Sequence, residues 1–177
     1  MKHYKYGGST AKRTEHCTAW VNLSEGIPKT VSDAANTGTA IHFMLESANL
    51  SDDVDFDSLR DTKCPETGLT IDRDMVSLAK IMWAADQALM DEYNVQEWEA
   101  ETTGQYSDLV GSTVDKVAVG TTDLGQVTLL IDYKTGTGVQ VDAVVNEQLL
   151  HNAWCLTESS EAQDLFEGSQ MLSLIHI

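Results

Sequence analysis

Three side chains that could handle a metal ion and a phosphate converge in one predicted β-hairpin. Two β-rich runs, Thr113–Val119 and Gln126–Tyr133, flank a turn that contains glycine, which is the pattern of a hairpin. Asp132 and Lys134 are two residues apart, so in a strand they point to the same face. Asp115 can lie opposite them in an antiparallel pair. Two carboxylates suit Mg²⁺, which prefers oxygen ligands and often binds only one or two carboxylates plus substrate phosphate.

The same Asp-x-Lys spacing also has a simpler interpretation as an exposed ion pair on a strand, which contributes little. Other motifs in a fixed order favour the metal site. From Ser9 to Trp154 the chain reads, in order, GGSTAKRTEHCTAWVNLSEGIP, AANTGTAIHFMLE, GSTVDKV, IDYKTG and NEQLLHNAW. With these motifs in this order and spacing, the chain resembles the PD-(D/E)XK nuclease superfamily, in its RecB-like branch, and is most similar to phage-encoded RecB-like nucleases.

The resemblance implies a metal-dependent deoxyribonuclease that hydrolyses phosphodiester bonds, as an exonuclease or DNA-processing nuclease of phage recombination or replication. It implies that Asp115 and Asp132 bind Mg²⁺, with Mn²⁺ as an alternative, and that the backbone carbonyl of Tyr133 is a further ligand. Lys134 would orient the attacking water or stabilise negative charge on the phosphate. The expected partners are DNA and phage recombination or replication proteins.

A histidine on the first long predicted helix is a further metal-site candidate. His42 and Glu46 are four residues apart in SDAANTGTAIHFMLESANL, so they share one helix face. The resemblance implies that His42 supports the metal, since the family carries a histidine or glutamate on its first core helix. The alternative is a surface His–Glu pair.

Two residues are expected to position DNA. Gln148 and Leu149 match the start of the family's Gln-Leu-x-x-Tyr signature, but Asn152 stands where tyrosine is expected, which puts substrate positioning in doubt. Gln148 could instead be an ordinary exposed helix residue. Arg13 belongs to an N-terminal segment of residues 1–30 that holds five basic and two acidic residues, a net charge of +3.

The rest of the chain is strongly acidic. The formal net charge is −17, so residues 31–177 carry −20, which argues against a general DNA-binding surface. DNA would therefore be held by the N-terminal segment and a local groove, with metal ions offsetting the central acids. An acidic, solubilising surface is the alternative explanation for most of these acids.

Three widely spaced cysteines predict a reducing cytoplasm rather than a disulfide framework. Some RecB-like relatives hold an iron–sulfur cluster with an N-terminal cysteine and three C-terminal ones, but no such trio follows here. Cys17 is therefore predicted to be a small buried residue. The chain contains neither a long apolar run nor a signal peptide, so we expect a cytoplasmic protein with no membrane partner.

The secondary-structure pattern predicts an α/β fold, with a mixed central sheet flanked by helices as in a restriction-endonuclease-like core. Helices are expected over 32–50, 72–93 and 142–156, and a short N-terminal helix is expected to run through Trp20. Ala85 and Ala88 belong to the predicted apolar face of the second of these long helices, and a first strand is expected over 95–103. That strand places three glutamates on one face, any of which could lie near the site: Glu97, Glu99 and Glu101.

Residues 1–171 are predicted to form one domain that is incomplete at its C-terminus. The final residues, 172–177, read LSLIHI, which equals the translation of a transposon adapter used in sequencing libraries, so no functional argument is based on them.

Two other function classes compete with the nuclease. One is a non-catalytic DNA-binding or recombination-partner protein that keeps the nuclease fold, which the acidity and the missing tyrosine favour. The other is a structural, DNA-mimicking acidic protein, which fits the charge but leaves the ordered motifs unexplained.

Overall fold

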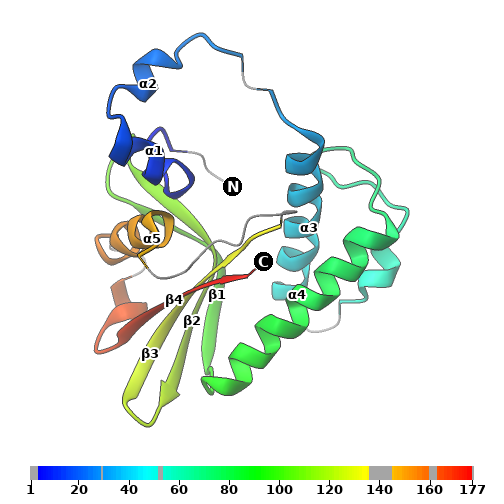
Figure 1. Cartoon of the computed structure of the whole chain (residues 1–177). Helices are drawn as coiled ribbons and strands as arrows, with labels where there is room; N and C mark the ends of the chain where they lie inside the picture. Colours follow the sequence, from blue (N-terminus) through cyan, green and yellow to red (C-terminus); the bar gives the residue numbers. More distant parts are fainter. Residues whose placement is uncertain (1–3, 29, 52–53, 136–144, 160–162, 177) are drawn as a thin grey trace. The chain divides into compact units, whose positions relative to one another are not determined.

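The computed structural model contains both helices and a β-sheet, which agrees with the predicted α/β class (Figure 1). It describes residues 4–28, 30–51, 54–135, 145–159 and 163–176. The helices are α1 (Ala11–His16), α2 (Trp20–Leu23), α3 (Asp33–Asn49), α4 (Arg73–Glu92) and α5 (Glu147–Thr157), with 3-10 turns η1 (Gly8–Thr10), η2 (Phe56–Leu59) and η3 (Gln163–Phe166). The strands are β1 (Glu97–Gln105), β2 (Gly111–Thr122), β3 (Gly125–Tyr133) and β4 (Gln170–His176).

The chain divides into two compact units. Unit 1 comprises residues 1–29, 93–132 and 142–174, and unit 2 comprises 30–92, 133–141 and 175–177. The boundary in the central hairpin falls between Asp132 and Tyr133. No helix of the described residues combines the length and the apolar character needed to cross a membrane.

The central hairpin confirms the sequence prediction. The four strands form one sheet in the order β1-β2-β3-β4, and both the β1–β2 and the β2–β3 pairs are antiparallel. Thr122 pairs with Gly125, so the loop between β2 and β3 has two residues. Gly125 has φ of 122°, a backbone conformation that side chains strongly disfavour, which explains the glycine at this position.

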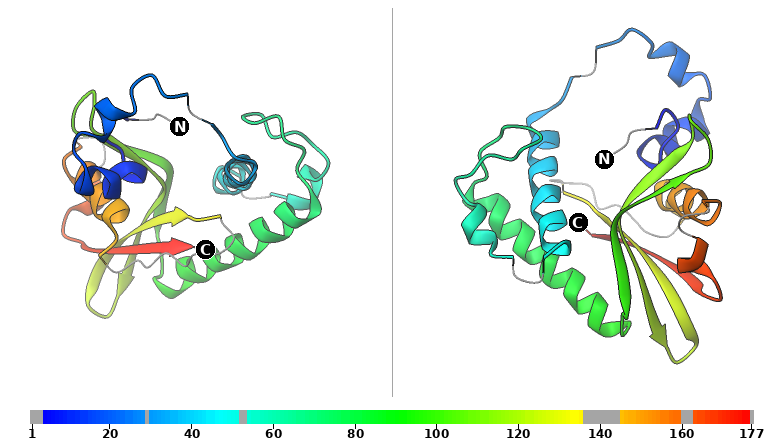
Figure 2. Two further views of the ribbon diagram at one scale, coloured as in Figure 1. Left: turned by 45° about the horizontal axis from the view of Figure 1, so that its top comes forward. Right: turned by 180° about the vertical axis from the view of Figure 1, so that it is seen from behind.

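Helix α5 covers one part of the sheet in unit 1 (Figures 1 and 2). A β-carbon at Gly104 would come within 2.5 Å of the Cys155 backbone, so only glycine lets α5 approach β1 this closely. The core beneath α5 is apolar, as expected where a helix stripe meets a sheet. Its buried members are Val114, Val117, Leu130, Ala153 and Leu156.

Helices α3 and α4 pack on each other in unit 2 and match the predicted helices closely. Ser32 caps α3, because its hydroxyl accepts a hydrogen bond from the Ala35 amide at 3.2 Å. Ile41, Leu45 and Ala48 are buried, as the helical spacing predicts.

One detail of α4 differs from the prediction. Ala85 and Ala88 were expected on the apolar face but are exposed, whereas Asp86 between them is fully buried. The stripe actually buried in the middle of α4 runs through Ala79 and Met82 to Asp86, which are three and four residues apart.

Three predicted boundaries shift in the structure. The N-terminal helix, expected to run through Trp20, ends at His16 and is followed by the short α2. The first strand begins two residues later than predicted, at Glu97. Helix α5 begins at Glu147 instead of near Asp142. Asn146 is its N-cap, because the Asn146 side chain accepts a hydrogen bond from the Leu149 amide at 3.1 Å. Residues 136–144, which include the predicted helix start, lie outside the described residues.

The prediction for Cys17 was wrong, because this cysteine is exposed. It follows α1 as an extended C-cap residue. Cys64 and Cys155 are buried, and burial raises the pKa of the Cys155 thiol to about 11.

The end of the chain forms β4, which adds a fourth strand next to β3. The sequence pattern had indicated three strands. This pairing of backbones does not bear on the origin of residues 172–177, and their adapter origin stays a prediction.

Candidate functional site

The register of the hairpin sets Asp115 against Asp132. The last two pairs toward the open end of the hairpin are Val117 with Leu130 and Lys116 with Ile131. One further step in the same register pairs Asp115 with Asp132, and directly opposed residues of an antiparallel pair have their β-carbons about 4.5–5.5 Å apart. Only 6% of Asp115 and 4% of Asp132 are exposed. Unit 1 therefore holds two buried carboxylates on neighbouring strands.

Helix α5 supplies a polar contact to this pair. The Gln148 side-chain amide donates a hydrogen bond to Asp132 Oδ1 at 2.9 Å, although the two residues are 16 positions apart. Gln148 is half-buried, so it is not the exposed helix residue of the alternative interpretation. The N-cap at Asn146 fixes where α5 begins, and hence which of its side chains faces Asp132.

Asn152, which stands where the family signature has tyrosine, has a structural role. Asn152 is fully buried, and its Oδ1 accepts a hydrogen bond from the Ser112 hydroxyl of β2. This contact ties α5 to the sheet rather than reaching a substrate. The signature residue Leu149 is also buried in unit 1.

Among the three glutamates of β1, Glu101 is distinguished by its position and backbone. Its neighbours Ala100 and Thr102 pair with Lys116 and Val114, so the same register sets Glu101 beside Asp115. Glu101 has φ of 52°, a left-handed conformation that is costly for a residue with a side chain and that clusters at functional sites. Sequence alternation could not single it out, because all three glutamates share its spacing.

In unit 2, His42 and Tyr133, both predicted to belong to the metal site, are in contact. Their rings meet edge to face, with centroids 6.2 Å apart. The Tyr133 hydroxyl donates to Asp86 Oδ1 at 3.0 Å and accepts from Asn49 Nδ2 at 3.3 Å. Tyr133 is thus held by side chains of both α3 and α4, which fixes the backbone of the residue whose carbonyl was predicted to bind metal.

Sequence reasoning missed Asp86 as a polar partner in this network. The signal was available, since an aspartate lies on the apolar stripe of α4, and a buried carboxylate must find a hydrogen-bond donor. Sequence reasoning also missed Lys116, which is 1% exposed and whose Nζ lies 5.3 Å from the centroid of the Trp98 ring.

The remaining predicted residues lie in different surroundings. Lys134 is half-buried and follows Tyr133 in unit 2, and Glu46 is half-buried on α3. Arg13 is exposed on α1 in unit 1, and its guanidinium lies 5.0 Å from the centroid of the Trp20 ring. An exposed guanidinium held over a ring remains able to contact a phosphate.

The donor set fits a hard divalent cation with few protein ligands. Within the described residues no cluster of three or more histidine, cysteine, aspartate or glutamate side chains could hold a metal ion. The pair of Asp115 and Asp132 offers only carboxylate oxygens, which suits Mg²⁺ because that ion keeps several waters and binds substrate phosphate. A site for Zn²⁺, which prefers four nitrogen and sulfur ligands, does not fit this pair.

Comparison with known proteins assigns the chain to a family. No curated protein matches the chain. A family model described as a protein of unknown function (DUF2800) matches residues 3–171, which is nearly the whole chain, and the chain therefore belongs to the DUF2800 family.

Proposed function

We propose that this protein is a Mg²⁺-dependent deoxyribonuclease with a restriction-endonuclease-like core. The observation that carries the proposal is the pair of buried carboxylates, Asp115 and Asp132, opposed in the register of β2 and β3. Burying two like charges side by side is unfavourable unless a cation offsets them. The Asp-x-Lys spacing and the hydrogen bond from Gln148 add support.

In this proposal each residue has a definite task. Asp115 and Asp132 supply the oxygen ligands, and Gln148 orients the Asp132 carboxylate by donating to one of its oxygens. A bound Mg²⁺ would lower the pKa of a water molecule and polarise the scissile phosphodiester. Lys134 stabilises the negative charge that develops on the phosphate oxygens.

The roles of three further residues come from the sequence resemblance. His42 supports the metal ligands, and the Tyr133 carbonyl adds an oxygen. Arg13, on the basic N-terminal segment, holds the phosphate backbone of the DNA, which positions the strand without reading its sequence.

A cleavage assay tests the proposal. Labelled linear and circular DNA, single- and double-stranded, is incubated with the protein in Mg²⁺, in Mn²⁺ or in EDTA. We expect cleavage that requires the metal and that Asp115→Asn abolishes, while Asp91→Asn, at an exposed position of α4, cleaves at the wild-type rate.

Absence of metal-dependent cleavage on every DNA form would reject the nuclease. Fluorescence anisotropy with the same DNA then tests the non-catalytic alternative. DNA binding that persists without cleavage would identify a binding protein that keeps the nuclease motifs.

A further inference from the structure

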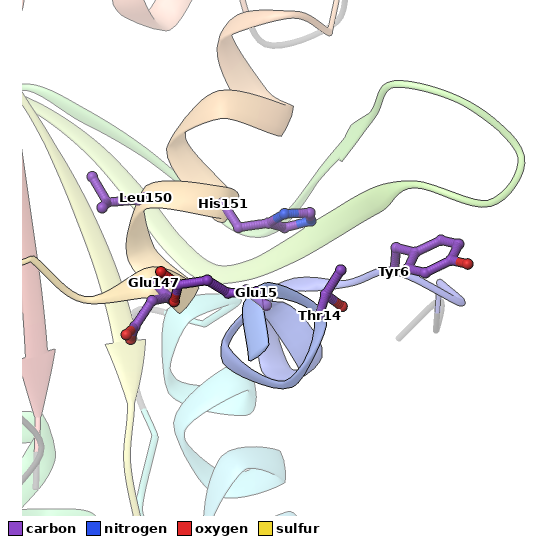
Figure 3. Close-up of a pocket in the computed structure, with 7 residues that line it drawn as sticks. Tyr6, Thr14, Glu15, Glu147, Leu150 and His151 are labelled. Atoms are coloured by element: carbon purple, nitrogen blue, oxygen red, sulfur yellow. The ribbon is translucent and has the colours of Figure 1, made fainter. Parts of the chain in front are cut away.

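Helix α5 carries a second set of side chains that the proposed nuclease site does not use. Gln148 donates to Asp132, whereas Glu147, Leu150 and His151 line a pocket of about 280 Å³. The other wall comes from the N-terminal segment, with Tyr6 and residues of α1 (Figure 3). The complete lining is Tyr6, Ala11, Thr14, Glu15, Glu147, Leu150 and His151, all within unit 1.

The pocket has acidic residues without a matching cation. The wall of the pocket is mainly apolar, Glu15 and Glu147 line it from opposite sides, and no lysine or arginine does. In the part of the chain that the structure describes, neither carboxylate makes a hydrogen bond or an ion pair with another residue. Two carboxylates that share a small pocket favour a positively charged occupant, because opposite charges steer and orient binding partners.

An exposed aromatic cluster continues from the pocket along the outward side of α5. The rings of Tyr106 and Trp154 are stacked at a tilt, with centroids 4.7 Å apart, although 57% of Tyr106 and 42% of Trp154 is exposed. The His151 ring meets Trp154 edge to face at 6.0 Å, so His151 belongs to both the pocket and the cluster. Leu150 lines the pocket and is 57% exposed.

This combination is typical of an interaction surface. Tryptophan and tyrosine are enriched where protein interfaces gain most of their binding energy, and large apolar side chains gathered on one surface often mark a binding site. A guanidinium also binds favourably over aromatic rings. The pocket is slightly smaller than the range of about 300–1,000 Å³ that is usual for small-molecule sites, which suits one side chain of a partner better than a cofactor.

We propose that this surface binds an arginine-bearing, apolar peptide segment of a partner protein. The arginine enters the pocket, where Glu15 and Glu147 accept hydrogen bonds from its guanidinium, which can bind carboxylates in bidentate geometry. The apolar neighbours of the arginine pack on Tyr106 and Trp154. Nucleic acid fits less well, because its phosphates would approach two carboxylates on a chain of net charge −17.

The test uses a fluorescein-labelled peptide, acetyl-Gly-Leu-Arg-Leu-Gly, and its anisotropy on titration with the protein of residues 1–177. A second peptide replaces arginine with citrulline, which has nearly the same shape but no charge. We expect the arginine peptide to bind at least about tenfold more tightly than the citrulline peptide. The interaction should also weaken at high salt, because the pocket is open to solvent.

Variants locate the binding site. The double variant Glu15→Gln/Glu147→Gln should weaken arginine-peptide binding at least about tenfold, and Trp154→Ala by a similar factor. The matched control Glu66→Gln/Glu92→Gln removes the same charge at two exposed positions of unit 2 and should bind as the wild type does. Trp98→Ala, at another exposed tryptophan, is the control for Trp154→Ala.

Three results would overturn the proposal. The first is no binding of the arginine peptide at millimolar protein concentrations, with circular dichroism showing a folded protein. The second is equal weakening by the pocket and control double variants, which would indicate general attraction to an acidic surface. The third is binding of a labelled oligothymidine that depends on Trp154 and excludes the peptide, which would make the cluster a stacking surface for nucleobases.

Discussion

Two buried aspartates, one in each unit, differ in the groups that surround their carboxylates. Asp86 of unit 2 accepts hydrogen bonds from the Tyr133 hydroxyl and from the Gln87 side chain, so the fold supplies donors to its charge. Asp132 of unit 1 accepts from Gln148 but is set against a second buried carboxylate, Asp115, by the strand register.

This difference separates a structural acid from a candidate functional one. A buried carboxylate with donors around it stabilises the native state relative to the same group without them. Opposed carboxylates lower stability, and such a cost is typical of sites that bind a cation or a substrate. The contrast predicts that substitution of Asp132 mainly lowers cleavage, whereas substitution of Asp86 mainly lowers stability.

The largest expected effect is the loss of DNA cleavage in the variant Asp132→Asn. The amide cannot replace the anionic oxygen that binds the metal, so the cleavage rate should fall on the order of 10³-fold or more. The free energy of unfolding should change by less than about 1 kcal/mol, because a repulsive charge is removed together with an acceptor. Single-turnover cleavage and urea denaturation measure the two quantities. Cleavage at the wild-type rate would show that Asp132 is a structural residue like Asp86.

Lys134→Ala should lower the cleavage rate on the order of 10²–10³-fold, the scale of a lost electrostatic stabiliser. The affinity for DNA should change little, because a single phosphate contact is a small part of the binding free energy. Cleavage kinetics and anisotropy on the same DNA separate the two effects. Lys63→Ala, at an exposed lysine of unit 2, serves as the control, and equal rate losses in both variants would remove Lys134 from the mechanism.

Asp86→Ala should lower the free energy of unfolding by about 1–3 kcal/mol, since the Tyr133 hydroxyl loses its acceptor in a buried position. Asp91→Ala, at an exposed position of α4, should change it by no more than about 0.5 kcal/mol. Urea denaturation at one pH gives both values. A variant as stable as the wild type would mean that the hydrogen bonds to Asp86 add no net stability, and the contrast with Asp132 would fail.

His42→Ala should weaken Mn²⁺ binding about 10- to 100-fold, the range found when residues supporting a metal site are lost. Isothermal titration calorimetry measures the affinity directly, without any requirement for cleavage. His16→Ala, at an exposed histidine of α1, provides the comparison. An affinity equal to that of the wild type would return His42 to a packing role against Tyr133.

Tyr133→Phe has the smallest expected effect. It removes the hydroxyl that links α3 and α4 but keeps the ring and the backbone carbonyl, so stability should fall by about 0.5–1.5 kcal/mol. The cleavage rate at a temperature where the variant is folded should match the wild type. A large loss of cleavage would assign the hydroxyl itself to the site.

The sequence by itself determined the local structure that carries the candidate residues. The turn between β2 and β3 needs a glycine at position 125, and α3 begins at a serine cap, so both elements follow from neighbouring residues. The predictions of the turn and of the helix succeed because they depend on interactions over a few positions of the chain. The period of a strand also predicts that Asp132 and Lys134 share one face, but β3 ends at Tyr133, so this stays a prediction.

Only the tertiary structure decided which side chains meet and which are buried. Gln148 reaches Asp132 across 16 positions, and Tyr133 reaches Asp86 across 47. Cys17 is exposed at the end of α1, and Glu101 differs from Glu97 and Glu99 in its backbone conformation and its burial. Periodicity specifies the face of an element, but burial and hydrogen bonding depend on the element that packs against that face, and this packing is fixed by the whole chain.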